Sequence, residues 1–291
     1  MKVAVVGPGA LGCLFAFRLS RAGNKVSLVD YRSDRADRLE ASGITVESAT
    51  GTTTQRVPVV THLPPGQDLI LVLTKAHATG NLRFPPETPV LTLQNGLGNV
   101  EALCSLVGSA RVLAGTTAEA ATLVAEGHTR HVASGLTRLG AWTSCSVQPV
   151  LDALRAAGFQ CDSTDSPGQA IWEKAAVNAG INPLTALLNV SNGRLLQIVE
   201  ARQLMRDLVV EAAKVASTEG YRFSKSLVEA AEETCRATAD NISSMLQDVR
   251  AGKRTEIDAI SGEILRRAQL ASLPTPRTRV VYQLIRGLES R

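Results

Sequence analysis

Hydrophobic and polar positions alternate in two different ways along this chain, and the change comes after its midpoint. In the first half, short runs rich in Val, Ile and Leu are followed by stretches with helical periodicity. The runs predict β-strands at 3–6, 25–30, 68–74 and 89–94, with helices at 11–22 and 33–42. This order is typical of an α/β fold with a Rossmann-type, doubly wound parallel sheet.

The Thr- and Gly-rich stretch 111–140 predicts further strands that close the same sheet with antiparallel members, and 148–157 predicts a helix. Residues 162–168 are small, polar and punctuated by Pro and Gly, as in a linker. Beyond them, helical periodicity dominates, at 171–177, 183–188, 195–219, 225–239 and 255–271. The pattern therefore predicts a dinucleotide-binding domain over 1–165 and an all-α substrate and catalytic domain over 166–291.

Composition narrows the class of protein. The 291 residues are 44% hydrophobic and 20% charged, the balance of a soluble globular protein long enough for two domains. The net charge of +4 is spread along the chain, which disfavours nucleic acid as a partner but suits a small anionic substrate. No apolar stretch approaches the ~20 residues of a membrane span. The five scattered cysteines indicate free thiols, so we expect a cytoplasmic protein.

A glycine-rich loop follows the first predicted strand and precedes the first predicted helix. Gly7, Gly9 and Gly12 have the GxGxxG spacing, in which the glycines permit a tight turn, a close approach to a pyrophosphate, and helix–strand packing. An acidic residue, Asp30, ends the second predicted strand. Asp30 would bind the ribose hydroxyls of NAD, whereas Arg32 and Arg35 close by would accommodate NADP. Both cofactors stay open at this point.

Two more strand ends carry polar residues. Lys75 follows the strand predicted over 68–74, and Asn95 follows the strand over 89–94. Ligands of open parallel sheets bind beyond the carboxyl ends of the strands, so both residues are candidates for the nicotinamide end of a dinucleotide. Ordinary loop residues are the alternative for each.

A polar stripe marks the second half. Lys174, Asn178 and Asn182 are spaced by four residues in an otherwise apolar stretch, so on a helix they are turned from one another by only about 40° per step. Because buried amides and charges require partners, the stripe suggests a ligand. One solvated face of a surface helix is the alternative. Further along, Asn241 and Ser244 would share another helical face, and Glu256 would begin a helix capped by Thr255.

Together these segments resemble the ketopantoate reductase family, in family order and over the full length. The matching pieces are Gly7-x-Gly9-Ala-Leu-Gly12, Lys75-Ala, Asn95-Gly-Leu-Gly98, Gly115-Thr-Thr117, Trp172-x-Lys174-x-x-x-Asn178-x-x-x-Asn182-Pro-Leu-Thr, Asn192-Gly, Asn241-Ile-Ser-Ser-Met-Leu-Gln-Asp248 and Arg254-Thr-Glu256-Ile-Asp258. The resemblance implies reduction of 2-dehydropantoate to (R)-pantoate by NADPH, on the route to pantothenate and coenzyme A.

The resemblance also implies roles for individual residues. Lys174 would be the proton donor, with Glu256 supporting its charge. The substrate residues would be Lys174, Asn178, Asn182, Asn192, Asn241 and Ser244. The cofactor residues would be Gly7, Pro8, Gly9, Ala10, Leu11, Gly12, Asp30, Arg32, Lys75, Asn95, Ala121 and Glu256. The family usually has an arginine right after the second strand; Asp30-Tyr31-Arg32 departs from this, so NADH is an alternative to NADPH.

Other functions are weighed against this one. A β-hydroxyacid dehydrogenase acting on another small oxo acid also uses a Lys-x-x-x-Asn pair but leaves the segment 241–248 unexplained. A non-catalytic NAD(P)-binding sensor would need only the first half of the chain. The chemistry requires no metal, and His62, His77, His128 and His131 lack matched partners in the sequence, which favours surface roles. A homodimer is left open.

Overall fold

The computed structural model describes residues 1–290, and these residues form two compact units. The N-terminal unit contains Met1–Gln94 and Asn99–Gly168, and the C-terminal unit contains Asn95–Gly98 together with the chain from Gln169 onward. Four residues in the first half of the sequence thus belong to the C-terminal unit.

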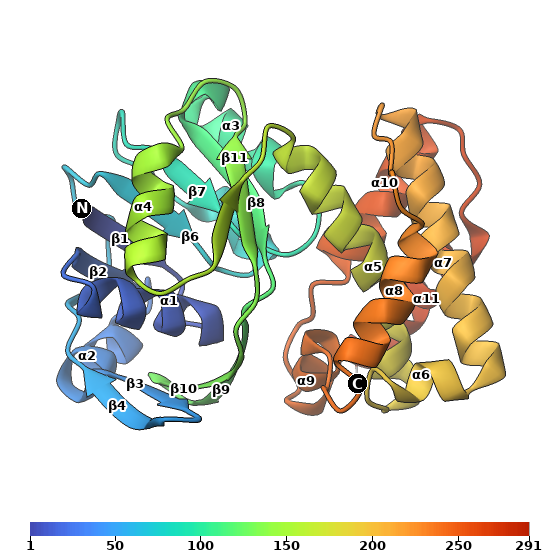
Figure 1. The fold of residues 1–291 in the computed structure, drawn as a ribbon, viewed down its shortest axis with the longest axis horizontal. Coiled ribbons are helices and arrows are strands. Elements are labelled where there is room, and N and C mark those ends of the chain that lie inside the picture. Colours follow the sequence, from blue (N-terminus) through green and yellow to red (C-terminus); the bar gives the residue numbers. More distant parts are fainter. Residues whose placement is uncertain (291) are drawn as a thin grey trace. The chain divides into compact units, whose positions relative to one another are not determined.

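An eight-stranded sheet forms the centre of the N-terminal unit (Figure 1), in the order β12-β11-β8-β7-β6-β1-β2-β5. All its neighbouring strands are parallel except β8 and β11. The expected doubly wound sheet with an antiparallel member is therefore confirmed. Its strands are β1 (Lys2–Val6), β2 (Lys25–Val29), β5 (Val59–Val60), β6 (Leu69–Val72), β7 (Val90–Thr92), β8 (Val112–Thr117), β11 (Thr137–Ala141) and β12 (Cys161–Ser163).

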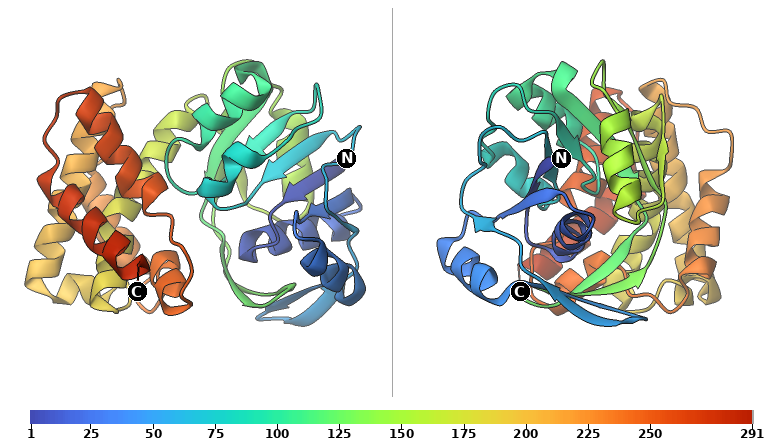
Figure 2. Two further views of the ribbon diagram at one scale, coloured as in Figure 1. Left: turned by 180° about the vertical axis from the view of Figure 1, so that it is seen from behind. Right: turned by 60° about the vertical axis from the view of Figure 1, so that its left-hand side comes forward.

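A second, four-stranded sheet corrects the sequence prediction for 111–140. The hairpin of β9 (Ala120–Ala125) and β10 (His128–Ala133) does not join the large sheet. Its strand β10 pairs with β3 (Ile44–Ser48), which in turn pairs with β4 (Gly51–Gln55). The physical reason is α1 (Ala10–Arg21), whose residues 12–17 are all buried. A helix that is apolar on all sides needs cover on all sides. In Figure 2, α1 lies between the two sheets, and it contacts strands of both.

The remaining helices of the N-terminal unit lie around the large sheet. α4 packs against α1 and β12, whereas α3 packs against β7 and β8. Their bounds are α2 (Ser33–Ser42), α3 (Asn99–Val107) and α4 (Gln148–Ala156), with 3₁₀ turns at η1 (Ala76–Asn81) and η2 (Ser109–Arg111). The segment predicted as a linker, 162–168, is mostly ordered structure, because its first residues continue β12 and α5 already begins at Pro167.

The C-terminal unit is helical, as expected (Figure 1). Its elements are α5 (Pro167–Leu188), α6 (Arg194–Gln197), α7 (Val199–Thr218), α8 (Leu227–Ala237), α9 (Ser244–Arg250), η3 (Asp258–Gly262), α10 (Glu263–Leu270) and α11 (Pro276–Glu289). The stretches predicted at 171–177 and 183–188 are one continuous helix that contains Pro183. The helix predicted at 195–219 is instead divided at Ile198, where the backbone is extended. The sequence prediction missed α11.

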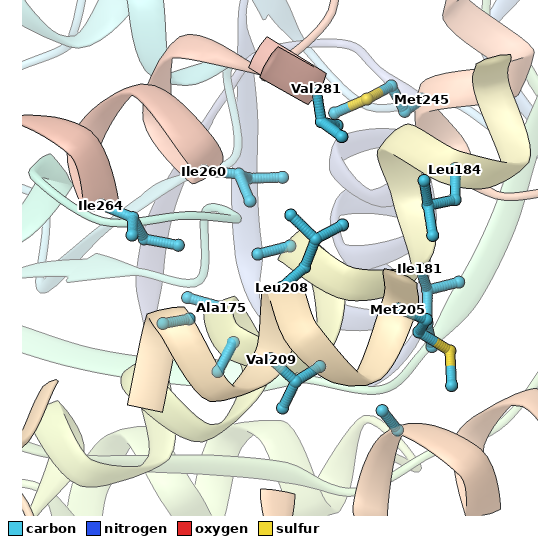
Figure 3. Close-up of a cluster of buried hydrophobic side chains, with 14 of the residues drawn as sticks. Ala175, Ile181, Leu184, Met205, Leu208, Val209, Met245, Ile260, Ile264 and Val281 are labelled. Atoms are coloured by element: carbon cyan, nitrogen blue, oxygen red, sulfur yellow. The ribbon is translucent and has the colours of Figure 1, made fainter. Parts of the chain in front are cut away.

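The core of this unit is aliphatic, with small residues at the closest helix contacts. Leu184, Leu208, Ile260 and other buried side chains from α5, α7, η3 and α10 meet there (Figure 3). A Cβ at Gly180 would lie 2.6 Å from a methyl group of Val209, so the glycine lets α5 and α7 approach closely. Within residues 1–290, no helix is sufficiently long and apolar to cross a membrane.

Candidate active site

The loop after β1 has the geometry of a phosphate-binding loop. Gly7 adopts a φ of +103°, in the left-handed region that favours glycine. A Cβ at Gly12 would lie 1.8 Å from the Gly7 carbonyl oxygen, whereas no described atom lies within 4 Å of a Cβ at Gly9. α1 begins at Ala10, and the first N–H groups of a helix lack partners within it. Free N–H groups at the start of a helix favour binding of an anion such as a pyrophosphate, so the loop stays the predicted site for the dinucleotide.

Three neighbouring strands end beside this loop. Val6 of β1 pairs with Val29 of β2 and with Val72 of β6, so the residues that follow these strands lie at one edge of the sheet. Gly7 is in close contact with Thr74, where an added Cβ would lie 2.8 Å from the backbone nitrogen. Lys75 comes next, at the residue that immediately precedes η1. The structure thus brings the expected cofactor segments together, and their roles stay predictions.

A glutamine that the sequence analysis did not single out stabilises the loop after β6 at this edge of the sheet. Gln94 is buried, and its side-chain amide donates to the Thr74 carbonyl oxygen at 2.8 Å and to the Thr79 hydroxyl at 2.9 Å. It therefore fixes the loop that leads to Lys75. No local pattern could identify this role, because both partners are 15 or more residues away in the sequence.

Asp30 and Arg32 are both at the end of β2 but have different partners. The Asp30 carboxylate accepts hydrogen bonds from two nitrogens of the Arg35 guanidinium. The guanidinium of Arg32 donates instead to Asp34, with 2.8 Å between Nη2 and Oδ2. Arg35, which the sequence analysis considered with Arg32 as an arginine for NADP, is instead the direct partner of the acid.

The environment of His131 corrects the prediction that the histidines have surface roles. Ala121 of β9 pairs with His131 of β10, whose ring is mostly buried. Nε2 of His131 lies 2.7 Å from a carboxylate oxygen of Glu119, and Arg18 donates to Nδ1 at 3.3 Å. The ring thus bridges a buried carboxylate and a guanidinium. The carboxylate also accepts from the backbone N–H of Gly135, so this cluster ties α1 to the β9–β10 hairpin.

The polar stripe of the C-terminal unit lies on one helix, as the spacing predicted. Lys174, Asn178 and Asn182 all belong to α5, each four residues after the last. Lys174 and Asn178 are partly buried, and Asn182 is buried. A solvated surface face is therefore the wrong description of the stripe.

Burial lowers the pKa of Lys174 to about 8, and the charge of Glu256 opposes this shift by raising it. The Asn95 side chain donates to the Glu256 carboxylate at 3.3 Å. Asn95 reaches this place because the segment 95–98 packs in the helical unit. The Leu97 N–H donates to the Ala259 carbonyl oxygen at 2.7 Å, which joins this segment to η3. The carboxylate of Glu256, the amide of Asn95 and the amino group of Lys174, whose pKa is lowered, thus lie in one region.

The segments that carry Asn192 and Asn241 are joined through their backbones. The N–H of Asn192 donates to the carbonyl oxygen of Asn241 at 3.0 Å. Asn241 and Ser244 do not share a helical face, which corrects the prediction. α9 begins only at Ser244, and Ser243 caps it by accepting from the N–H of Leu246. Ser244 is exposed at the first turn.

A buried pair of hydroxyl groups connects α5 with the residue before α9. The Thr185 hydroxyl on α5 lies 2.7 Å from the Ser243 hydroxyl, and Thr185 is fully buried. This contact places the start of α9 beside the end of the α5 stripe. Thr255 accepts from the N–H of Ile257, but η3 begins only at Asp258, so the prediction that Glu256 begins a helix capped by Thr255 is wrong. In the part of the chain that the structure describes, no three His, Cys, Asp or Glu side chains are grouped to hold a metal ion.

Comparison with known proteins identifies the family. The model described as ketopantoate reductase PanE/ApbA matches residues 3–144, and the model of the PanE/ApbA C-terminal region matches residues 168–289. The chain belongs to the ketopantoate reductase family. This family member is accordingly an NAD(P)-dependent oxidoreductase, and the expectation drawn from its motifs is confirmed.

Its relatives span the same length. A 2-dehydropantoate 2-reductase of Halobacterium salinarum is 35% identical over 297 residues, 98% of each chain, and that of Yersinia pestis is 34% identical over 100% of this chain and 96% of its own. Among solved structures, D-mandelate dehydrogenase with NADH and anilino(oxo)acetate superposes with a TM-score of 0.93 at 26% identity, covering 100% of this chain and 99% of its own. A PanE/ApbA family ketopantoate reductase from Ralstonia eutropha has a TM-score of 0.90 at 30% identity, with the same coverage.

Proposed function

We propose that this protein reduces 2-dehydropantoate to (R)-pantoate, a step of pantothenate and coenzyme A biosynthesis, with Lys174 as the proton donor. The hydride comes from a reduced nicotinamide dinucleotide, NADPH or NADH, which the glycine loop and the ends of β1, β2 and β6 would hold. The names of the relatives support the reaction. The state of Lys174 supports the role given to that residue.

The lowered pKa of Lys174 is the observation that carries this proposal. A lysine with a pKa of about 8 is still mostly protonated near neutral pH, yet it gives up its proton more readily than an ordinary lysine. Its Nζ would donate that proton to the alkoxide that forms when C2 of the substrate is reduced. A positioned general acid contributes typically ~10²–10⁴-fold to the rate, and a cation aimed at the developing charge stabilises it as well.

The amides beside Lys174 would orient the substrate. Asn178 and Asn182 follow Lys174 on the same face of α5, and Ser244 presents a hydroxyl at the start of α9. These groups donate hydrogen bonds to a carboxylate without adding a charge that would compete with the ammonium of Lys174. Glu256 would maintain the ammonium form, because its negative charge raises the pKa of Lys174.

Asn192 distinguishes the proposed substrate from simpler oxo acids. The Thr238 hydroxyl donates its single hydrogen to the Thr234 carbonyl oxygen at 2.6 Å, so toward Asn192 it can only accept. The Asn192 amide therefore turns its NH₂ group to Thr238, at 2.9 Å. Its oxygen is buried and has no hydrogen-bond partner among residues 1–290. An oriented acceptor of this kind calls for a donor, which the 4-hydroxyl group of 2-dehydropantoate would supply.

A second candidate is a reductase of aryl-substituted 2-oxo acids. The structural likeness to D-mandelate dehydrogenase favours it, since that enzyme was solved with NADH and anilino(oxo)acetate. Such substrates have no hydroxyl to donate to Asn192. Reduction rates for 2-dehydropantoate and phenylglyoxylate, measured side by side with each dinucleotide, separate the two candidates.

The variant Lys174→Ala tests the role of the lysine. We expect kcat to fall by roughly 10²–10⁴-fold, because the general acid is lost, while dinucleotide affinity changes by less than about twofold. Lys214→Ala is the matched control, since Lys214 is an exposed lysine of the same unit. Turnover is followed by oxidation of the dinucleotide, and affinity by its fluorescence. Turnover of Lys174→Ala close to that of the control would refute the proton-donor role.

A further inference from the structure

The carboxylate at the end of β2 is buried and held in place. Asp30 is only 3% exposed. One of its oxygens accepts from the backbone N–H of Arg32 at 3.2 Å and from Nη2 of Arg35 at 2.8 Å, and the other accepts from Nε of Arg35. The end of the second strand is where an acidic residue binds the ribose hydroxyls of a dinucleotide. A buried, bidentate ion pair fixes the negative charge at this place.

The arginines around Asp30 already have partners. Arg32 donates to Asp34 at 2.8 Å, and Arg38 donates to both oxygens of Glu126, at 2.9 and 3.2 Å. We call this set the β2-end cluster; its members are Asp30, Arg32, Asp34, Arg35, Arg38 and Glu126. It contains three arginines and three carboxylates, so its charges balance, and it holds no excess positive charge with which to attract a phosphate.

A 2′-phosphate would disturb this cluster, whereas a 2′-hydroxyl would not. The phosphate carries up to two negative charges, which Asp30 repels. Recruiting Arg35 to the phosphate would leave the buried charge of Asp30 without its partner. A ribose hydroxyl, in contrast, can donate to a carboxylate without any change in charge. We propose that Asp30, paired with Arg35, makes this enzyme prefer NADH to NADPH.

This inference rests on the proposed function, because it presupposes that the glycine loop binds a dinucleotide. It reverses the preference for NADPH that the family resemblance implies. The relevant departure is confined to Asp30-Tyr31-Arg32, which places an acid, paired with Arg35, where the family usually has an arginine. Arg32, which the sequence analysis considered within reach of the 2′-phosphate, is bonded to Asp34.

Equilibrium binding tests this preference without relying on turnover. NADH and NADPH are titrated into the full-length protein without oxo acid, with dinucleotide fluorescence as the signal. ADP-ribose and its 2′-phosphorylated form are compared by calorimetry as probes that lack the nicotinamide. We expect NADH to bind at least about tenfold more tightly than NADPH, and ADP-ribose to show the same preference over its phosphorylated form.

The variant Asp30→Asn assigns the preference to its residue. Removing the charge should bring the NADPH-to-NADH ratio of Kd close to one, mainly by strengthening NADPH binding. Asp37→Asn is the matched control, because it removes an exposed carboxylate of the following helix, α2, outside the β2-end cluster, and should leave the ratio unchanged. Circular dichroism checks that both variants are folded, and if Asp30→Asn is not, the two ADP-ribose probes decide on the wild-type protein.

The outcomes separate the two claims. Equal or tighter binding of NADPH by the wild type, or an unchanged ratio in folded Asp30→Asn, overturns the preference but leaves a dinucleotide-dependent reductase. Absence of binding by both dinucleotides overturns the preference and the proposed function together.

Discussion

The glycine loop of the N-terminal unit and the polar region of the C-terminal unit are built by opposite means. The loop depends on missing atoms: Gly7, Gly9 and Gly12 lie within six residues, and their lack of side chains makes the turn, the open space and the close packing. The polar region depends on side chains from distant segments, since Asn95, Lys174 and Glu256 are brought together only by folding.

This difference determines how much free energy each region loses by burying polar groups, and which substitutions it tolerates. A site made of backbone buries few polar side chains, so it costs little in desolvation. It loses its shape, however, when a side-chain atom is added to one of its glycines. A side-chain site buries amides and a charge, which is unfavourable unless partners are provided. Lys174 shows that cost as a lowered pKa, and Asn192 shows it as a buried oxygen without a hydrogen-bond partner among residues 1–290. Under the proposed function, both costs would be offset when the substrate binds.

The largest effect is expected from a methyl group added to the loop. Gly12→Ala places a Cβ against the Gly7 carbonyl oxygen, so it should destabilise the protein by about 1–3 kcal/mol or more and abolish dinucleotide binding. Gly9→Ala meets open space instead. It should leave the thermal midpoint nearly unchanged but weaken binding at least about tenfold, because the methyl group occupies the place of the pyrophosphate. Thermal unfolding and fluorescence titration measure both, and full affinity in Gly9→Ala would contradict the backbone site.

A smaller effect is expected from removing the buried amide oxygen of Asn192. Asn192→Ala should lower kcat/KM for 2-dehydropantoate by roughly 10–100-fold, as for loss of a buried hydrogen bond worth about 1–3 kcal/mol. The internal control is 3,3-dimethyl-2-oxobutanoate, which has the same skeleton without the hydroxyl group. Its kcat/KM should change by less than about threefold. An equal loss for both acids would mean that Asn192 supports the fold and does not recognise the hydroxyl.

The smallest effect is a shift in the pH profile. Lys174 must be protonated to act as an acid, so activity should decline as pH rises through its pKa of about 8. Glu256 raises this pKa, and Glu256→Gln should therefore move the alkaline decline of kcat/KM to lower pH. Glu263→Gln is the control, as its carboxylate is bonded to Arg266 and Arg267. A decline that stays in place in Glu256→Gln would show that Glu256 does not act on the lysine.

Most of the framework followed from the sequence. The alternation of short apolar runs with helices predicted the parallel sheet, and the four-residue spacing of the α5 stripe predicted its common face. The β9–β10 hairpin and His131 were misjudged for a shared reason. Their partners, β3 and Glu119, are chosen by the need to cover an apolar helix and to compensate a buried charge, and neither need appears in a local pattern.

The sequence by itself determined the glycine loop, the acid that ends β2 and the polar stripe, because their chemistry depends on contiguous residues and on the regular period of a helix. Only the tertiary structure decided which arginine holds Asp30, that Asn95 belongs with Glu256, and which way the Asn192 amide points. These outcomes depend on hydrogen bonds between residues distant in sequence or on competition among several equivalent partners. Local periodicity carries no information about either.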